Sequence, residues 1–262
     1  KDIPKKIKNN ISNMSDTGTI VVWKNCDKLD VARGDTLYRH MGDDLCRIFR
    51  HYLDDDNEYG MQIEILYNVI GKNIYKLKAN DPLYLMRPNT CPGHESAPTN
   101  VMQITKDIPV GYIDDKGNPQ KTNIKFSFST SLPDIQKLGG SSDVGKHYLK
   151  NTGISLVRKA REIDFGNFGF FDGQEARERW WGCEIRFEPE LDELFGLTNN
   201  KQYALKFVYE DDIKNKDKFG EDEYSERLKT DFGLQLRRNI SKEFDNVHSP
   251  QIKIIKKRFT GT

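Results

Sequence analysis

The chain has 262 residues, and its 41 Lys and Arg stand against 40 Asp and Glu, so its net charge is only +1. A charge this close to zero argues against strong, purely electrostatic binding to nucleic acid or to an anionic membrane. No apolar run approaches the roughly 18 residues of a membrane-spanning helix, and the opening KDIPKKIKNN lacks the apolar core of a signal peptide. We therefore expect no membrane partner.

The four cysteines, Cys26, Cys46, Cys91 and Cys183, lie far apart and form no C-x-x-C pair. This spacing predicts reduced, structural thiols in a cytoplasmic protein and no metal site. The chain also begins without Met, which indicates a fragment or a processed product.

The first hundred residues predict a strand, a helix and a hairpin in that order. Gly18 to Cys26 is β-branched and aromatic, as in a strand. From Asp35 onward an apolar stripe recurs at helical spacing (Leu37, Met41, Leu45, Ile48, Phe49 and Tyr52). Residues 61–70 and 74–79 predict a hairpin, and residues 80–100, with four prolines, predict a connecting segment.

The remaining chain predicts a mixed sheet with few helices. Strands are expected at 101–104, 110–113, around 124–128, over 153–166 as one strand or a pair, and at 180–190. Helices are expected within 133–151, just before Gly196, and from Tyr224 to Val247, where apolar residues recur every four positions. Residues 252–259 are interpreted as a terminal strand or a basic tail. The order indicates an α/β or α+β fold with a partly antiparallel sheet.

A group of three cations and one separate lysine are candidate site residues. Arg158, Lys159 and Arg161 lie along one strand or its turn, although salt-bridged surface decoration explains them equally well. Lys201 lies in the polar loop TNNKQ, where a flexible ammonium can contact a phosphate but where an ordinary loop lysine is also common. No G-x-S-x-G nucleophile motif is present.

Several segments together resemble the region that follows the nucleotide-binding domain in GHKL ATPases. They are GTIVVWKNCDKLD, LYRHMGDDLCRIFRHYL, NDPLYL, GISLVRKAREID and WWGCEIRFEPELDELFGLTNNKQ. The resemblance is to the MORC-like and heat-shock-chaperone-like bacterial ATP-binding proteins of that superfamily. It extends from about Gly18 to Val247, and VRKAREI and TNNKQ are its most specific parts.

The resemblance implies that residues 1–53 are the tail of a nucleotide-binding domain with a linker helix. Residues 54–262 would form a two-layer transducer domain with a mixed sheet and a left-handed βαβ crossover. Lys201 would then be the catalytic contact to the γ-phosphate of ATP. Asn200 and Gln202 would shape its loop or contact the nucleotide's surroundings, and Arg158, Lys159 and Arg161 would support the site or the domain interface.

The resemblance also implies ATP and Mg²⁺ as cofactors, bound mainly by a preceding domain. The acid-and-asparagine helix and the D-x-G-x-G loop of that domain are absent from this sequence, so we expect the chain alone not to hydrolyse ATP. The implied partners are its own ATP-binding domain, a second copy in a homodimer, and DNA or a client protein. DNA repair, chromatin, phage defence and chaperoning all remain open as processes. The alternatives are a nucleic-acid-binding module that uses residues 252–259, or an interaction scaffold built on the helix from Tyr224 to Val247.

Overall fold

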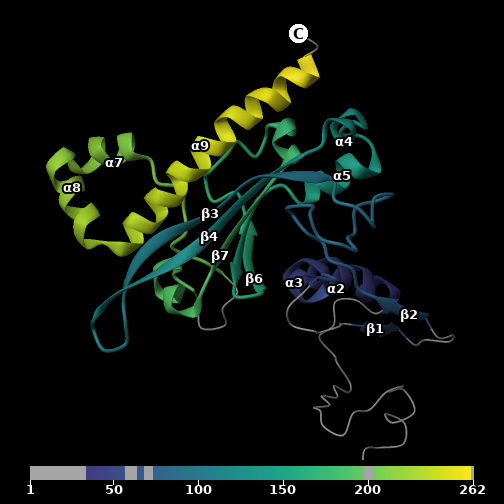
Figure 1. Cartoon of the computed structure of the whole chain (residues 1–262), viewed down its shortest axis with the longest axis horizontal. Coiled ribbons are helices and arrows are strands. Elements are labelled where there is room, and N and C mark those ends of the chain that lie inside the picture. The colour runs from purple at the N-terminus through teal and green to yellow at the C-terminus, as the bar shows by residue number, and fades with distance from the viewer. Residues whose placement is uncertain (1–33, 57–63, 68–72, 198–202, 261–262) are drawn as a thin grey trace, which may run out of the picture.

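The computed structural model describes residues 34–56, 64–67, 73–197 and 203–260 (Figure 1). The strand expected at Gly18 to Cys26 lies outside these ranges. The helix predicted from Asp35 is confirmed as two pieces, α2 (Gly34–Ile48) and α3 (Arg50–Leu53), which are separated at Phe49. The predicted hairpin is confirmed by the antiparallel pairing of β1 (Glu64–Tyr67) with β2 (Asn73–Lys76).

The main sheet has five strands in the order β3-β4-β7-β5-β6. Their bounds are β3 (Asn100–Ile113), β4 (Pro119–Ser131), β5 (Ile154–Arg158), β6 (Arg161–Gly166) and β7 (Trp181–Phe187). β5 pairs in parallel with β7, and the other neighbouring strands pair antiparallel. The fold is therefore α+β with a mixed sheet, as the sequence predicted at that level.

The expectation of two separate strands at 101–104 and 110–113 is wrong, because both belong to the single strand β3. Pro109 lies within this strand, opposite Asn123 of β4. Proline cannot donate to a neighbouring strand, but β3 is at the edge of the sheet, where one side of its backbone forms no strand ladder. The proline therefore does not interrupt the strand.

Short helices connect and flank the strands. They are α4 (Pro133–Lys137) and α5 (Asp143–Lys150), then a 3₁₀ turn (Ala176–Trp180) before β7, and a second 3₁₀ turn (Pro189–Leu191) that leads into α6 (Asp192–Phe195). The predicted helix, loop and short helix within 133–151 are confirmed as α4 and α5. α6 ends at Gly196, whose φ of 67° is left-handed, so the predicted glycine stop is confirmed as well.

The carboxyl-terminal third differs from the prediction in two ways. The helix expected from Tyr224 to Val247 is divided at Asp231, whose carboxylate accepts a hydrogen bond from the backbone N–H of Leu234 and so caps a new helix. The helices there are α7 (Asp212–Phe219), α8 (Glu221–Thr230) and α9 (Phe232–Thr260).

The second correction concerns residues 252–259, which are the end of α9 and not a strand or a tail. The alternation Ile252-Lys253-Ile254 imitates a strand, but Ile252 and Ile255 are the buried pair whereas Ile254 is 44% exposed. A separation of three residues is a helical spacing, so Ile252 and Ile255 lie on the same buried side of the helix.

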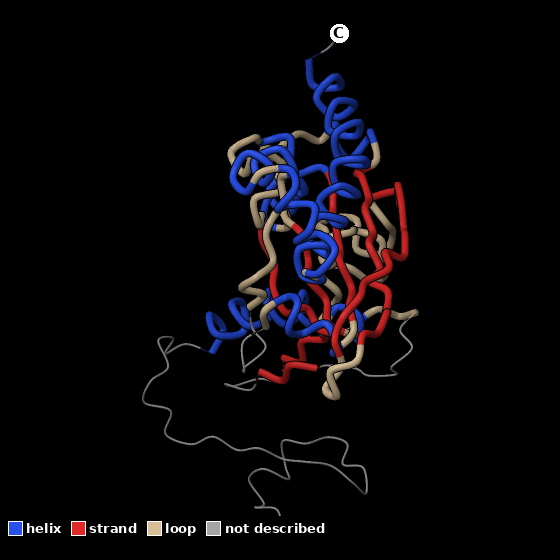
Figure 2. The backbone as a smooth tube through the Cα atoms, turned by 90° about the vertical axis from the view of Figure 1, so that its left-hand side faces the viewer, coloured by secondary structure: helices blue, strands red, loops and turns tan. Residues whose placement is uncertain are grey.

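One face of the sheet is apolar. Its side chains alternate along β4, β5 and β7, and we call them the apolar face: Ile124, Phe126, Phe128, Ile154, Leu156, Cys183, Ile185 and Phe187. α9 crosses β3 and β4 and continues past the strands at one end of the molecule, while α2 and α3 lie towards the other end (Figures 1 and 2). The ring of Phe244 from α9 packs edge-on against Phe128 and Trp181.

The opposite face carries polar side chains, and we call it the ionic face: Ser127, Ser129, Ser155, Glu162 and Glu184, which are buried, and Arg186, which is half-buried. The strand register places Ser127, Glu184 and Ser155 in one row across β4, β7 and β5. The segment before β3 covers this face, since the hydroxyl of Ser129 donates to the Leu83 carbonyl. Gly182 is required there, because a Cβ atom at that position would lie 2.0 Å from the Pro82 carbonyl oxygen.

Candidate functional site

The three predicted cations Arg158, Lys159 and Arg161 lie at the tight turn between β5 and β6. Lys159 has a left-handed φ of 57° and its backbone N–H donates to the carbonyl of Phe187 at 2.9 Å. The guanidinium of Arg158 pairs with Asp192 at 2.7 Å. The three side chains therefore form no common cluster.

Arg161 instead contacts the residue that joins the two helices preceding the sheet. Its guanidinium carbon lies 5.9 Å from the ring centroid of Phe49, between α2 and α3. A cation over an aromatic face at this distance is weakly attractive. Arg158 and Arg161 thus connect one turn to two different elements.

The remaining predicted site residues, Asn200, Lys201 and Gln202, lie outside the described residues. The two ends of their loop are described. Leu197 and Ala204 form an antiparallel bridge, and the backbone N–H of Ala204 donates to Asp164 on β6 at 3.0 Å. Because Asp192 begins α6, the Arg158–Asp192 ion pair braces the helix that leads into this loop.

A group of deeply buried ion pairs surrounds Arg50 on α3, which sequence reasoning missed. Arg50 is 0% exposed. Its two terminal nitrogens donate to Glu162 at 2.8 Å, to Glu184 at 2.6 Å and to the Ser155 hydroxyl at 2.6 Å. Its Nε lies 3.8 Å from the carboxylate of Asp81, which itself accepts three backbone N–H groups.

Three more side chains surround the two glutamates that bind Arg50. His51 Nε2 lies 2.9 Å from Glu184, and His51 Nδ1 lies 3.0 Å from a guanidinium nitrogen of Arg186. Since only a donor suits the carboxylate, the contacts place a hydrogen on Nε2 and leave Nδ1 to accept from Arg186. Arg47 donates to the second oxygen of Glu162 at 2.6 Å. We call these side chains, with Arg50, Asp81 and Ser155, the Arg50 cluster.

The cluster is close to neutral, because three arginines face three carboxylates. Burial by itself would raise the pKa of Glu184, but the charge of Arg50 and the hydrogen bond from His51 outweigh it and hold that pKa well below its usual range. Burial likewise opposes the charged form of Arg50, yet the neighbouring carboxylates raise its pKa. Both groups therefore stay ionised, and each depends on the other.

A signal for this cluster exists in the sequence. Ser155, Glu162 and Glu184 interrupt strands whose other buried positions are apolar, and a polar residue at a buried strand position needs a partner. Arg47 and His51 are four positions apart, a spacing that places both on one side of the helical segment, and the structure turns that side towards β6 and β7. The sequence did not indicate which carboxylates they would meet.

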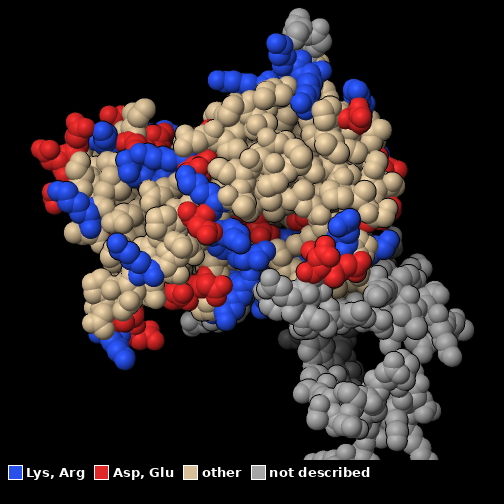
Figure 3. Space-filling view, in the orientation of Figure 1, with Lys and Arg blue, Asp and Glu red and all other residues tan. Residues whose placement is uncertain are grey.

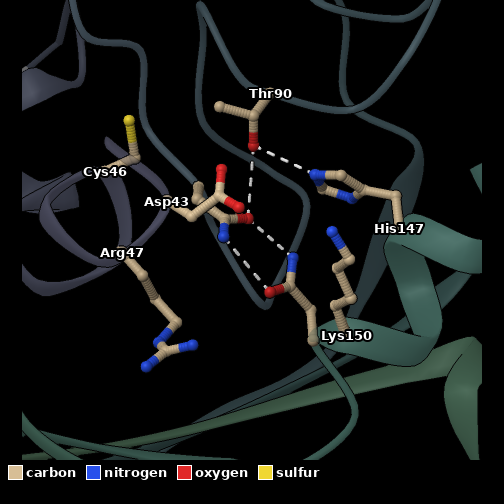
Figure 4. Close-up of a pocket in the computed structure, with 8 residues that line it drawn as sticks. Asp43, Cys46, Arg47, Thr90, His147 and Lys150 are labelled. Atoms are coloured by element: carbon tan, nitrogen blue, oxygen red, sulfur yellow. Dashed lines mark hydrogen bonds between the residues drawn. The ribbon is translucent and has the colours of Figure 1, made fainter. Parts of the chain in front are cut away.

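A pocket of about 340 Å³ lies beside this cluster, between α2, the segment before β3, and α5 (Figure 4). It is lined by Asp43, Cys46, Arg47, Asn80, Thr90, His147, Lys150 and Asn151. Asp43 and Lys150 are exposed at its rim, on opposite walls, while Asn151 at its floor is 2% exposed. No sequence motif pointed to this pocket.

The floor is a chain of hydrogen bonds in which each group can accept from the one before it and donate to the one after it. Asn151 donates to Tyr84 oxygen at 3.1 Å, and that hydroxyl lies 3.0 Å from His147 Nδ1. If Tyr84 donates to Nδ1, then His147 Nε2 carries the hydrogen and donates to Thr90 at 3.1 Å, and Thr90 donates to Asn80 at 3.2 Å. Asn80 and Asn151 also pair through their amides. Every link fits a neutral imidazole.

The electrostatics of His147 agree with that assignment. Burial and the nearby Lys150 ammonium lower the pKa of His147 to about 4, against a smaller opposite effect of Asp43. At neutral pH the floor is therefore uncharged, and the charges of the pocket are at its rim.

Among the described residues, no group of three His, Cys, Asp or Glu side chains is arranged to hold a metal ion. Cys46, Cys91 and Cys183 are free and buried, as the sequence predicted for structural thiols, and burial raises the pKa of each. No helix within the described ranges is both long and apolar enough to span a membrane. Comparisons of the chain with models of known protein families, with curated proteins and with solved structures found no match.

Proposed function

We propose that this chain is the transducer region of a GHKL-type ATPase. In this role it couples ATP binding and hydrolysis in a preceding domain to movement of a partner, and Lys201 contacts the γ-phosphate. ATP and Mg²⁺ belong to the preceding domain. An ammonium at the γ-phosphate both senses the group that hydrolysis removes and stabilises the charge that develops on it.

The observation that carries the proposal is the contact between VRKAREI, one of the two segments that most specifically resemble this family, and the segment that leads directly into the other, TNNKQ. VRKAREI forms the β5–β6 turn, and FEPELDELFG forms the end of β7 and α6. They are joined by the Lys159–Phe187 backbone hydrogen bond and the Arg158–Asp192 ion pair. The loop of Lys201 begins directly after α6 and returns beside β6. The two described ends of the lysine loop therefore lie against the same unit that these two segments form.

The Arg50 cluster supplies a mechanical link for this coupling. α3 belongs to the part that the resemblance assigns to the linker after the ATP-binding domain. Its Arg50 is bonded to β5, β6 and β7 at once, through Ser155, Glu162 and Glu184. A displacement of α3 cannot leave these buried charges unpaired without a large cost, so the sheet must follow the helix.

The proposal is tested by Lys201→Ala in the intact protein that contains this chain. We expect ATP turnover to fall roughly tenfold to a hundredfold with little change in thermal stability. Lys214→Ala is the matched control, because Lys214 is an exposed lysine on α7, and it should leave turnover unchanged. Equal turnover in the wild type and Lys201→Ala would contradict the assignment.

A second candidate function, binding to an anionic partner such as DNA, rests on the end of α9. Lys253, Lys257 and Arg258 are exposed there, and Figure 3 shows the Lys and Arg side chains gathered where the helix projects beyond the sheet. Affinity for duplex DNA that falls steeply with salt and is lost in Lys253→Glu/Lys257→Glu would support this function. No binding at low salt would remove it.

A further inference from the structure

The pocket of Figure 4 is used neither by the proposed coupling nor by the lysine loop, yet it has the features of a built binding site. Its volume of about 340 Å³ is at the small end of the range of about 300–1,000 Å³ that is typical of ligand pockets. It is formed by three segments far apart in the sequence, so it exists only in the folded chain. Its floor is held rigid by the hydrogen bonds that join Tyr84, His147, Thr90, Asn80 and Asn151.

The rim places two opposite charges on facing walls. The carboxylate of Asp43 comes from α2 and the ammonium of Lys150 from α5, and in Figure 4 both are directed towards the space between the two helices. Both lie close enough to His147 to shift its pKa, in opposite directions. Neither has an ion-pair partner among the described residues. Arg47, the other charged side chain of the lining, is already bonded to Glu162.

We propose that this pocket binds a free α-amino acid, through its ammonium at Asp43 and its carboxylate at Lys150. A free amino acid carries both charges at neutral pH and presents them a short distance apart. The amides of Asn80 and Asn151 at the floor offer hydrogen-bond donors and acceptors to the same groups. The neutral His147 adds no third charge that the ligand would have to compensate.

The charge pattern separates this ligand class from simpler ones. An inorganic anion on Lys150 would meet the repulsion of Asp43, and a simple amine on Asp43 would meet that of Lys150. Each of those ligands pairs with one of the two charges and leaves the other unpaired, whereas a zwitterion pairs with both Asp43 and Lys150. Binding would also bridge α2, which bears the Arg47 of the Arg50 cluster, to α5.

Direct titration of the chain with a panel of free amino acids tests the proposal, with isothermal titration calorimetry and ligand-observed NMR as readouts. We expect at least one free amino acid to bind at up to millimolar concentration, and its N-acetyl and carboxamide derivatives to bind at least about tenfold more weakly, because each lacks one charge. Inorganic phosphate is the probe for a site that accepts only anions.

Two pairs of variants identify the site. Asp43→Asn and Lys150→Met should each weaken binding by about tenfold or more. The matched controls are Asp44→Asn on α2 and Lys146→Met on α5, which are exposed neighbours that do not line the pocket and should leave binding unchanged. All four positions are exposed, so folding is expected to persist, and circular dichroism checks it.

Three results overturn the proposal. The first is that no free amino acid binds at millimolar concentration. The second is that Asp43→Asn and Lys150→Met bind as tightly as the wild type. The third is that phosphate or an N-acetyl amino acid binds as tightly as the free amino acid and depends on Lys150 alone, which would define an anion site.

Discussion

The two faces of the central sheet are held to their neighbours by different forces. On the apolar face, α9 packs through rings such as Phe244 against Phe128 and Trp181, and no charge is involved in these contacts. On the ionic face, α3 is held by the fully buried Arg50 and its carboxylates. The same strands carry both faces, since Glu184 and Ile185 are consecutive residues of β7.

The two kinds of contact lose stability in different ways when a residue is changed. Apolar packing loses stability in proportion to the volume removed, and it responds little to pH. A buried ion pair behaves differently, because loss of one partner leaves the other charged, desolvated and unpaired. The apolar face therefore suits permanent cover by α9, whereas the ionic face suits a contact whose breakage is sharp.

The largest effect is expected for Arg50→Met, which keeps much of the side-chain volume but removes the charge. The free energy of unfolding should fall by about 3–5 kcal/mol, since the buried carboxylates of Glu162 and Glu184 lose their main counter-ion. Urea denaturation followed by circular dichroism measures it. Adding Glu162→Gln and Glu184→Gln should recover part of the loss, and a loss below about 1 kcal/mol for the single variant would contradict the role of this charge.

A smaller effect is expected for Glu184→Gln, about 1–3 kcal/mol at neutral pH. Because the folded-state pKa of Glu184 is depressed, its contribution is present above the ordinary value of 4.5 and is lost as pH falls below it towards the folded pKa. The difference between the wild type and the variant should therefore shrink below about pH 4.5. Denaturation curves at pH 7 and at successively lower pH values measure this, and a difference that stays constant would refute the linkage.

The neighbouring residue on the apolar face gives the matched comparison. Ile185→Val removes one methylene from a fully buried site and should cost about 0.5–1.5 kcal/mol. Since no charge changes, this cost should be the same at pH 7 and at pH 4. The same denaturation series provides the measurement, and a pH-dependent cost would show that the two faces are not independent.

The smallest effect concerns the pocket beside the ionic face. NMR titration of the His147 ring should give a pKa of about 4, so this group's contribution to stability is present above its ordinary 6.5 and is lost as pH falls towards 4. Lys150→Met should raise that pKa and Asp43→Asn should lower it further, according to the sign of each charge. A ring that titrates near 6.5 in the wild type would contradict the neutral floor.

Much of the fold could be predicted because it depends on local patterns. Alternating apolar residues identified β4 and β7, and the glycine after α6 marked its end. The errors arose where local patterns are ambiguous. Two separate strands were predicted where β3 is a single edge strand that tolerates Pro109, and the alternation at 252–254 imitated a strand within α9. Of the site, Arg158, Lys159 and Arg161 were found as a group, but their separate partners were not.

The sequence by itself determined where most strands of the sheet and several of the helices lie, because periodicity follows from backbone geometry. It also carries Ser155, Glu162 and Glu184 among the apolar residues of those strands. Only the tertiary structure decided how those polar residues are satisfied. Arg50 meets Glu162 and Glu184 across 112 and 134 positions of the chain, and the pocket between α2 and α5 joins segments equally remote. The positive charge of Arg50 requires carboxylate partners, but the sequence does not say which carboxylates. The fold decides this, because a buried ion pair needs contact distances that only the packing of the chain can set.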